Sequence, residues 1–133
     1  MADTRPWITC HVLDTVAGKP GAGIDVTLTL ISPAQDLASF SAKTNSDGRV
    51  TAWRSSDKGY FQELNSAIEY VKKDMSEGGQ MVWSLKFDSG RYFGEGNTFW
   101  PEVELRFATK VNEAHYHVPL LLGPWSYTTY RGS

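Results

Sequence analysis

Three histidines and one arginine are the residues of this sequence best suited to acid–base chemistry. The histidines are His11, His115 and His117, and the last two are separated by a single residue. Imidazole titrates near neutral pH and can therefore carry protons in a reaction. Arg49, which follows a Gly-containing turn, has a permanently charged fork of N–H donors. From pattern alone, these side chains could serve proton transfer, bind a metal, or simply face solvent.

The metal alternative is weak because two histidines two positions apart still need further ligands. No spacing of cysteines or carboxylates supplies a third one, and we expect no metal and no cofactor. The single cysteine, Cys10, lies between Ile8 and Val12 and is expected to be a small buried side chain. The sequence also has no phosphate-binding glycine loop and no nucleophile elbow.

The histidines are predicted to lie on the outer faces of β-strands. Residues two apart in a strand point the same way, so His115 and His117 share a face opposite Tyr116 and Val118. His11 likewise points away from the apolar stripe of its own strand. An antiparallel sheet with one solvated face gives the same pattern, and Arg49 after its turn could also be merely solvated.

Alternating and apolar segments predict a β-sandwich with one clear helix. Helical spacing over Glu63–Met75 predicts that helix, and the segment 89–101 is left unassigned. Strands are predicted at 7–15, 24–31, 38–44, 49–53, 80–88, 103–109, 115–122 and 127–130.

Length and composition fit one globular domain over residues 1–133. The formal net charge is -2, with no basic run, so we expect no nucleic-acid partner. No apolar stretch is long enough to span a membrane. We expect a cytoplasmic location, with the peroxisome as the alternative, because no secretory signal is recognisable and Arg-Gly-Ser is not a peroxisomal ending.

Three motifs resemble those of the transthyretin-like family. The first runs from His11 to Thr15 and is followed by Gly18 and Pro20, and the second is Thr44-Asn45-Ser46-Asp47-Gly48-Arg49. The third begins at His115-Tyr116-His117 and closes with Tyr130-Arg131-Gly132-Ser133. The resemblance covers roughly residues 7–133. It implies an all-β, transthyretin-like two-sheet sandwich with one or two short helices, one of them in an insertion near residues 62–76.

Within that family the sequence is similar to the enzymatic branch, the 5-hydroxyisourate hydrolases. The thyroid-hormone carriers of the same fold have lysine, glutamate and threonine in place of His11, Arg49 and His117, and they lack the Tyr-Arg-Gly-Ser ending. A carrier of small aromatic ligands is the main alternative, and an interaction domain without a small-molecule site is the second.

The resemblance implies a reaction and a set of roles. The expected substrate is 5-hydroxyisourate, hydrolysed to 2-oxo-4-hydroxy-4-carboxy-5-ureidoimidazoline in urate breakdown. His11, Arg49 and His117 are the expected catalytic residues, and the positive charge of Arg49 should keep one histidine neutral.

The tail and the assembly complete these expectations. Tyr130, Arg131 and Ser133 are expected to bind the substrate. The resemblance also implies a homotetramer with sites where dimers meet. The segment 55–79 is longer than the family's usual connection, and a surface insertion of this kind is tolerated.

Overall fold

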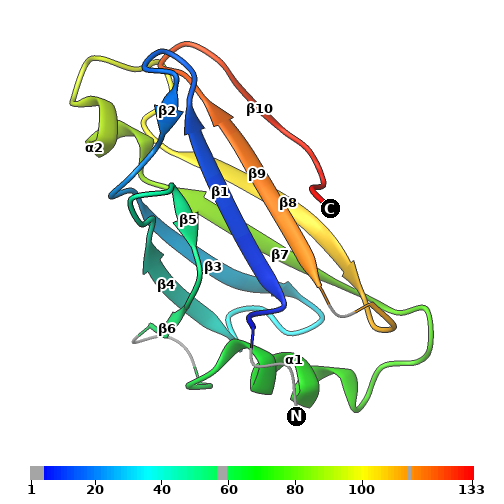
Figure 1. Ribbon diagram of the computed structural model, residues 1–133. Helices are drawn as coiled ribbons and strands as arrows, with labels where there is room; N and C mark the ends of the chain where they lie inside the picture. Colours follow the sequence, from blue (N-terminus) through cyan, green and yellow to red (C-terminus); the bar gives the residue numbers. More distant parts are fainter. Residues whose placement is uncertain (1–4, 57–59, 114) are drawn as a thin grey trace.

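The computed structural model describes residues 5–56, 60–113 and 115–133, which form two facing β-sheets (Figure 1). The strands of the first sheet are β1 (Ile8–Asp14), β2 (Lys19–Pro20), β5 (Arg49–Val50), β9 (Tyr116–Leu122) and β10 (Tyr127–Thr129). Those of the second are β3 (Asp25–Ser32), β4 (Ser39–Lys43), β6 (Arg54–Ser55), β7 (Gln80–Phe87) and β8 (Val103–Lys110). The sheet orders are β10-β9-β1-β2, with β5 also on β1, and β6-β4-β3-β7-β8. The predicted two-sheet, all-β sandwich is confirmed.

The core lies between the sheets and is built from the predicted alternation. On β1, Ile8, Cys10 and Val12 are buried while the residues between them are half-buried on the other face. Trp83 and Phe40 are the largest of the fully buried side chains contributed by the second sheet. Burial of this much apolar surface is the main force that holds the two sheets together.

A parallel pair of strands, β1 and β9, forms the middle of the first sheet. Its register places Thr9 opposite His117 and His11 opposite Pro119. Because strand residues alternate between faces, the outward side chains of both strands gather on one surface of this sheet. That surface faces away from the core and carries two of the three histidines.

Two helices lie at opposite ends of the sandwich (Figure 1). Helix α1 (Leu64–Lys72) confirms the predicted inserted helix and buries Leu64, Ala67, Ile68 and Val71. It ends before the predicted Met75, which packs against the core from the following loop. Helix α2 (Ser89–Phe93) occupies part of the segment left unassigned. Among the described residues, no helix is long and apolar enough to cross a membrane.

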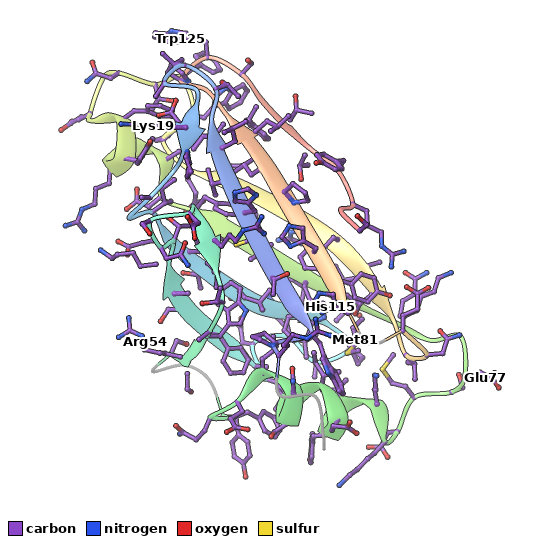
Figure 2. The ribbon with its side chains drawn as sticks, viewed as in Figure 1. Lys19, Arg54, Glu77, Met81, His115 and Trp125 are labelled. Atoms are coloured by element: carbon purple, nitrogen blue, oxygen red, sulfur yellow. The ribbon has the colours of Figure 1, made fainter. Side chains whose placement is uncertain are left out.

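Most predicted strands end within one residue of the observed ones, but the strand predicted at 49–53 was wrong. Residues 49–53 do not form one strand: only Arg49 and Val50 pair with β1, and the chain then crosses to the second sheet, where β6 pairs with β4. At the crossing, the indole N–H of Trp53 donates to the carbonyl of Ile8 at 2.8 Å. His115 lies just before β9, at the end of the sheet nearer α1 (Figure 2).

Candidate active site

Two imidazoles face each other on the outer surface of the first sheet. The ring centroids of His11 and His117 are 6.5 Å apart and their planes are inclined by 30°. Both side chains are half-buried. At this separation both rings can reach one water molecule or one substrate atom, so the first condition for shared proton transfer is met.

The turn before β5 brings Arg49 to the same surface. The side chain of Asn45 accepts hydrogen bonds from the backbone N–H groups of Asp47 and Arg49 at 2.9 and 3.0 Å. Gly48 has a φ of 74°, and its carbonyl accepts a hydrogen bond from the N–H of Val12 at 2.8 Å. A Cβ at this position would collide with the backbone oxygen of Val12 in β1. The turn therefore fixes Arg49 in register with His11.

A depression of about 250 Å³ lies between these strands. Its lining combines the guanidinium of Arg49 with two imidazoles and the last residue of the chain. The lining residues are Thr9, Cys10, Arg49, Val50, Thr51, His115, His117 and Ser133. A concave site with a few convergent polar groups is the usual setting for a small ligand.

A larger hollow of about 430 Å³ lies next to this depression, between α1 and the chain around Trp53. Thr51 lines both, but Glu63 is the one titratable side chain among the described residues that line the larger hollow. Because these described residues include no histidine and no arginine, size alone does not make the larger hollow the better candidate for proton-transfer chemistry.

The surroundings of His117 favour its neutral form. Burial lowers the pKa of this imidazole below its ordinary value of 6.5, and the positive charge of Arg49 lowers the pKa further, followed by His11 and His115. The expected effect of the arginine is confirmed, although burial is the larger cause. A neutral imidazole at neutral pH can accept a proton.

Thr9 is a site residue that we did not predict. Its hydroxyl Oγ1 lies 2.8 Å from Nδ1 of His117. Thr9 and His11 are two apart on one strand, so they share a face, and this spacing was a signal available in the sequence. The pairing of β1 with β9 was not.

The C-terminal tail is fastened beside His117. After β10, the N–H of Gly132 donates to the carbonyl of His117 at 2.8 Å. A Cβ on Gly132 would lie 2.8 Å from Cδ2 of His117 and 3.0 Å from Cγ of Pro119, so the tail runs close against the ring. This course brings Ser133 to the depression, and its predicted contact with substrate stays a prediction.

Tyr130 and Arg131 lie elsewhere in the single subunit. The guanidinium of Arg131 bonds Oε2 of Glu113 at 2.8 Å and lies 4.7 Å from the ring centre of Tyr116. Tyr130 is 58% exposed. Both line a second depression of about 250 Å³ that also touches His117, between β8 and the β9–β10 pair. Their predicted contact with substrate stays a prediction.

Cys10 is buried as predicted, and burial raises the pKa of its thiol to about 12. A thiol with so high a pKa is a poor nucleophile. Among the described residues, no group of three or more His, Cys, Asp or Glu side chains is arranged to hold a metal ion.

The sequence model of the HIUase/Transthyretin family matches residues 8–132. The chain belongs to this family. A probable 5-hydroxyisourate hydrolase of Schizosaccharomyces pombe is 35% identical over 135 residues, with 96% of this chain and 92% of the relative covered. The 5-hydroxyisourate hydrolase of Mus musculus is 35% identical with full coverage of both chains, and that of Deinococcus radiodurans is 37% identical with 97% and 98% covered.

Solved structures of the HIUase/Transthyretin fold superpose over almost the whole chain. Klebsiella pneumoniae 5-hydroxyisourate hydrolase gives a TM-score of 0.63 at 22% identity, covering 96% of this chain and 99% of that one. Sea bream transthyretin in complex with thyroxine gives 0.67 at 20% identity, covering 95% and 94%. A hydrolase and a hormone-binding protein match the backbone about equally well, so these superpositions show the fold and do not separate the two activities.

Proposed function

We propose that this protein hydrolyses 5-hydroxyisourate to 2-oxo-4-hydroxy-4-carboxy-5-ureidoimidazoline, without a metal or cofactor. The observation that carries the proposal is that Arg49 and His117 line one depression of about 250 Å³, while His11, which is not in its lining, lies opposite Arg49 in the sheet and 6.5 Å from the ring of His117. Relatives named as 5-hydroxyisourate hydrolases, at 35–37% identity over nearly the whole chain, support the same reaction.

The reaction adds water across a ring C–N bond. The unprotonated Nε2 of His117 takes a proton from water as the water oxygen bonds to the acyl carbon. The carbonyl oxygen becomes an oxyanion, and the N–H donors of Arg49 stabilise that charge. When the oxyanion re-forms its C=O bond, the C–N bond breaks, and the departing nitrogen receives the proton. His11 orients the water and shares this proton with His117.

We further propose that the working form is a homotetramer with sites where dimers meet. The catalytic side chains lie on an outer sheet face, where a partner subunit could cover the depression and exclude water. Excluding water strengthens the interaction between Arg49 and the oxyanion. In such an assembly, Tyr130 and Arg131 would bind substrate across the interface.

The test is the decay of the substrate, followed by ultraviolet absorbance. Urate and urate oxidase generate 5-hydroxyisourate in the cuvette, and the purified chain should accelerate its disappearance well beyond the spontaneous rate. His117→Thr and Arg49→Glu are the matched inactive variants. An unchanged decay rate with the wild-type chain, combined with saturable binding of thyroxine, would favour the carrier alternative instead.

A further inference from the structure

The side chain of Thr9 is hydrogen-bonded to the ring of the candidate base. Its Oγ1 lies 2.8 Å from Nδ1 of His117, and the two residues are opposite each other in the parallel pair of β1 and β9. Both side chains are half-buried. A neutral imidazole carries one proton on one of its two nitrogens, and the hydrogen bond made by one nitrogen decides the state of the other.

We propose that Thr9 is a positioning residue: its hydroxyl accepts the Nδ1–H of His117 and thereby leaves Nε2 unprotonated. The proposal rests on the hydrolase function proposed above, because it explains how His117 is prepared to accept a proton from water. Thr9 itself acts through His117 and exchanges no proton with the substrate.

The surroundings of the ring show which nitrogen serves the site. The Nδ1 edge faces Thr9, and the Cδ2 edge lies against Gly132, where a Cβ would come within 2.8 Å. The remaining edge of the imidazole carries Nε2 and Cε1. This edge is the one that neither Thr9 nor Gly132 occupies, and the ring lines both the depression that contains Arg49 and the one that contains Tyr130.

The charge of Arg49 favours the neutral ring that the proposed bond requires. A guanidinium is a permanent cation. Its positive charge lowers the pKa of His117 and so disfavours the imidazolium, in which both ring nitrogens would carry protons. Thr9, in turn, can accept at Oγ1 and donate its own proton to water, because its side chain is half-buried.

Removing the hydroxyl should free the ring to adopt the other tautomer. Thr9→Val keeps the shape and the strand preference of the side chain and deletes only the hydrogen bond. Thr9→Ser keeps the hydroxyl. Thr27→Val is the matched control, since Thr27 is also a half-buried strand threonine but belongs to β3 of the other sheet.

The experiment measures tautomer and turnover on the same proteins. Long-range proton–nitrogen correlation spectra of ¹⁵N-histidine-labelled protein report which ring nitrogen of His117 is protonated. We expect Nδ1–H in the wild type, Thr9→Ser and Thr27→Val, and a shift toward Nε2–H in Thr9→Val. We also expect Thr9→Val to lose about 10- to 100-fold in kcat, the usual effect of removing a partner that orients a functional histidine, with a smaller change in KM.

The outcomes are separable. A wild-type His117 with Nε2–H and a bare Nδ1 would overturn the proposal, and so would a Thr9→Val protein with unchanged tautomer and kcat. If neither the wild type nor any variant accelerates substrate decay, the proposed hydrolase function fails. If the tautomer of His117 still shifts in Thr9→Val, the positioning role is nevertheless supported.

Discussion

Arg49 lies directly opposite His11 in the antiparallel pairing of β5 with β1. Since β5 is only two residues long, the turn closed by Asn45 holds this register rather than an extended ladder. A permanent cation is thus fixed beside two imidazoles, close enough to His117 to lower its pKa.

Replacing Arg49 or His117 should abolish most turnover. Arg49→Glu and His117→Thr should each lower kcat/KM at least about 100-fold, the scale for losing an oxyanion donor or a general base. Circular dichroism should show an intact fold, since both side chains lie outside the core. Arg54→Glu, at an exposed position of β6, is the charge-matched control. A near-normal rate in either site variant would remove that residue from the mechanism.

The pH profile should depend on Arg49. Protonation of His117 removes the proposed base, so kcat/KM should fall as pH drops through its lowered pKa, which lies below 6.5. Arg49→Gln removes a like charge, so the pKa of His117 should rise and the acid limb should move to higher pH. Burial and the charges of His11 and His115 remain. Proton NMR titration of His117 checks the shift, and a limb that stays in place or moves to lower pH would contradict it.

The same shift makes a prediction for stability. The unfolded chain binds the proton at His117 more readily than the folded chain, so this group contributes stability above its unfolded pKa near 6.5. That contribution is lost as pH falls toward the lowered folded pKa. In Arg49→Gln the loss should be smaller. Urea denaturation of the two proteins between neutral and mildly acidic pH measures the difference, and an equal loss in both would contradict the linkage.

A methyl group at position 132 should displace the tail. In Gly132→Ala the new Cβ would meet Cδ2 of His117, so the tail must move and take Ser133 with it. Turnover should fall while the core stays folded. Gly78→Ala is the control, because Gly78 has a φ of 84° and no atom lies near a new Cβ. This variant should be about 1 kcal/mol less stable than the wild type and should keep full activity. Equal kcat in the two variants would contradict this role of the tail.

Arg131 can be tested as an anchor or as a substrate ligand. If it acts by binding Glu113, then Arg131→Gln, Glu113→Gln and the double variant should raise KM by similar factors. If Arg131 contacts substrate across a subunit interface, Arg131→Gln should be far more damaging than Glu113→Gln. Steady-state kinetics of the three proteins distinguish the two roles.

The inserted helix should stabilise the start of β1. Asn65 of α1 accepts from the N–H of Trp7 at 3.0 Å and donates to the carbonyl of Arg5 at 2.8 Å. Asn65→Ala should therefore lower the free energy of unfolding by about 1–2 kcal/mol, the usual value for lost hydrogen bonds. Ser66→Ala, at an exposed position of the same helix, is the control. Urea denaturation measures both, and equal stabilities would exclude this role for Asn65.

The local sequence pattern predicted most strands, the helix α1 and which strand residues face the core. It could not predict contacts between segments that are distant in the sequence. Alternation on β1 placed Cys10 in the core and His11 outside, and helical spacing found α1. The bond between Thr9 and His117 depends on the register of a parallel pair, which no local signal encodes. The ion pair of Arg131 with Glu113 depends on the path of the tail. Neither could be deduced before β9 was placed beside β1.

The parallel pairing of β1 with β9 also sets when the site can exist. Thr9 and His117 are 108 positions apart in the chain. During synthesis, β1 emerges from the ribosome first and must wait for its central partner until nearly all of this chain has been made. A product truncated before β9 would carry His11 and Arg49 but not His117, the proposed base. The proposed site therefore forms only after β9 has been made, and chains that stop before β9 should have no hydrolase activity.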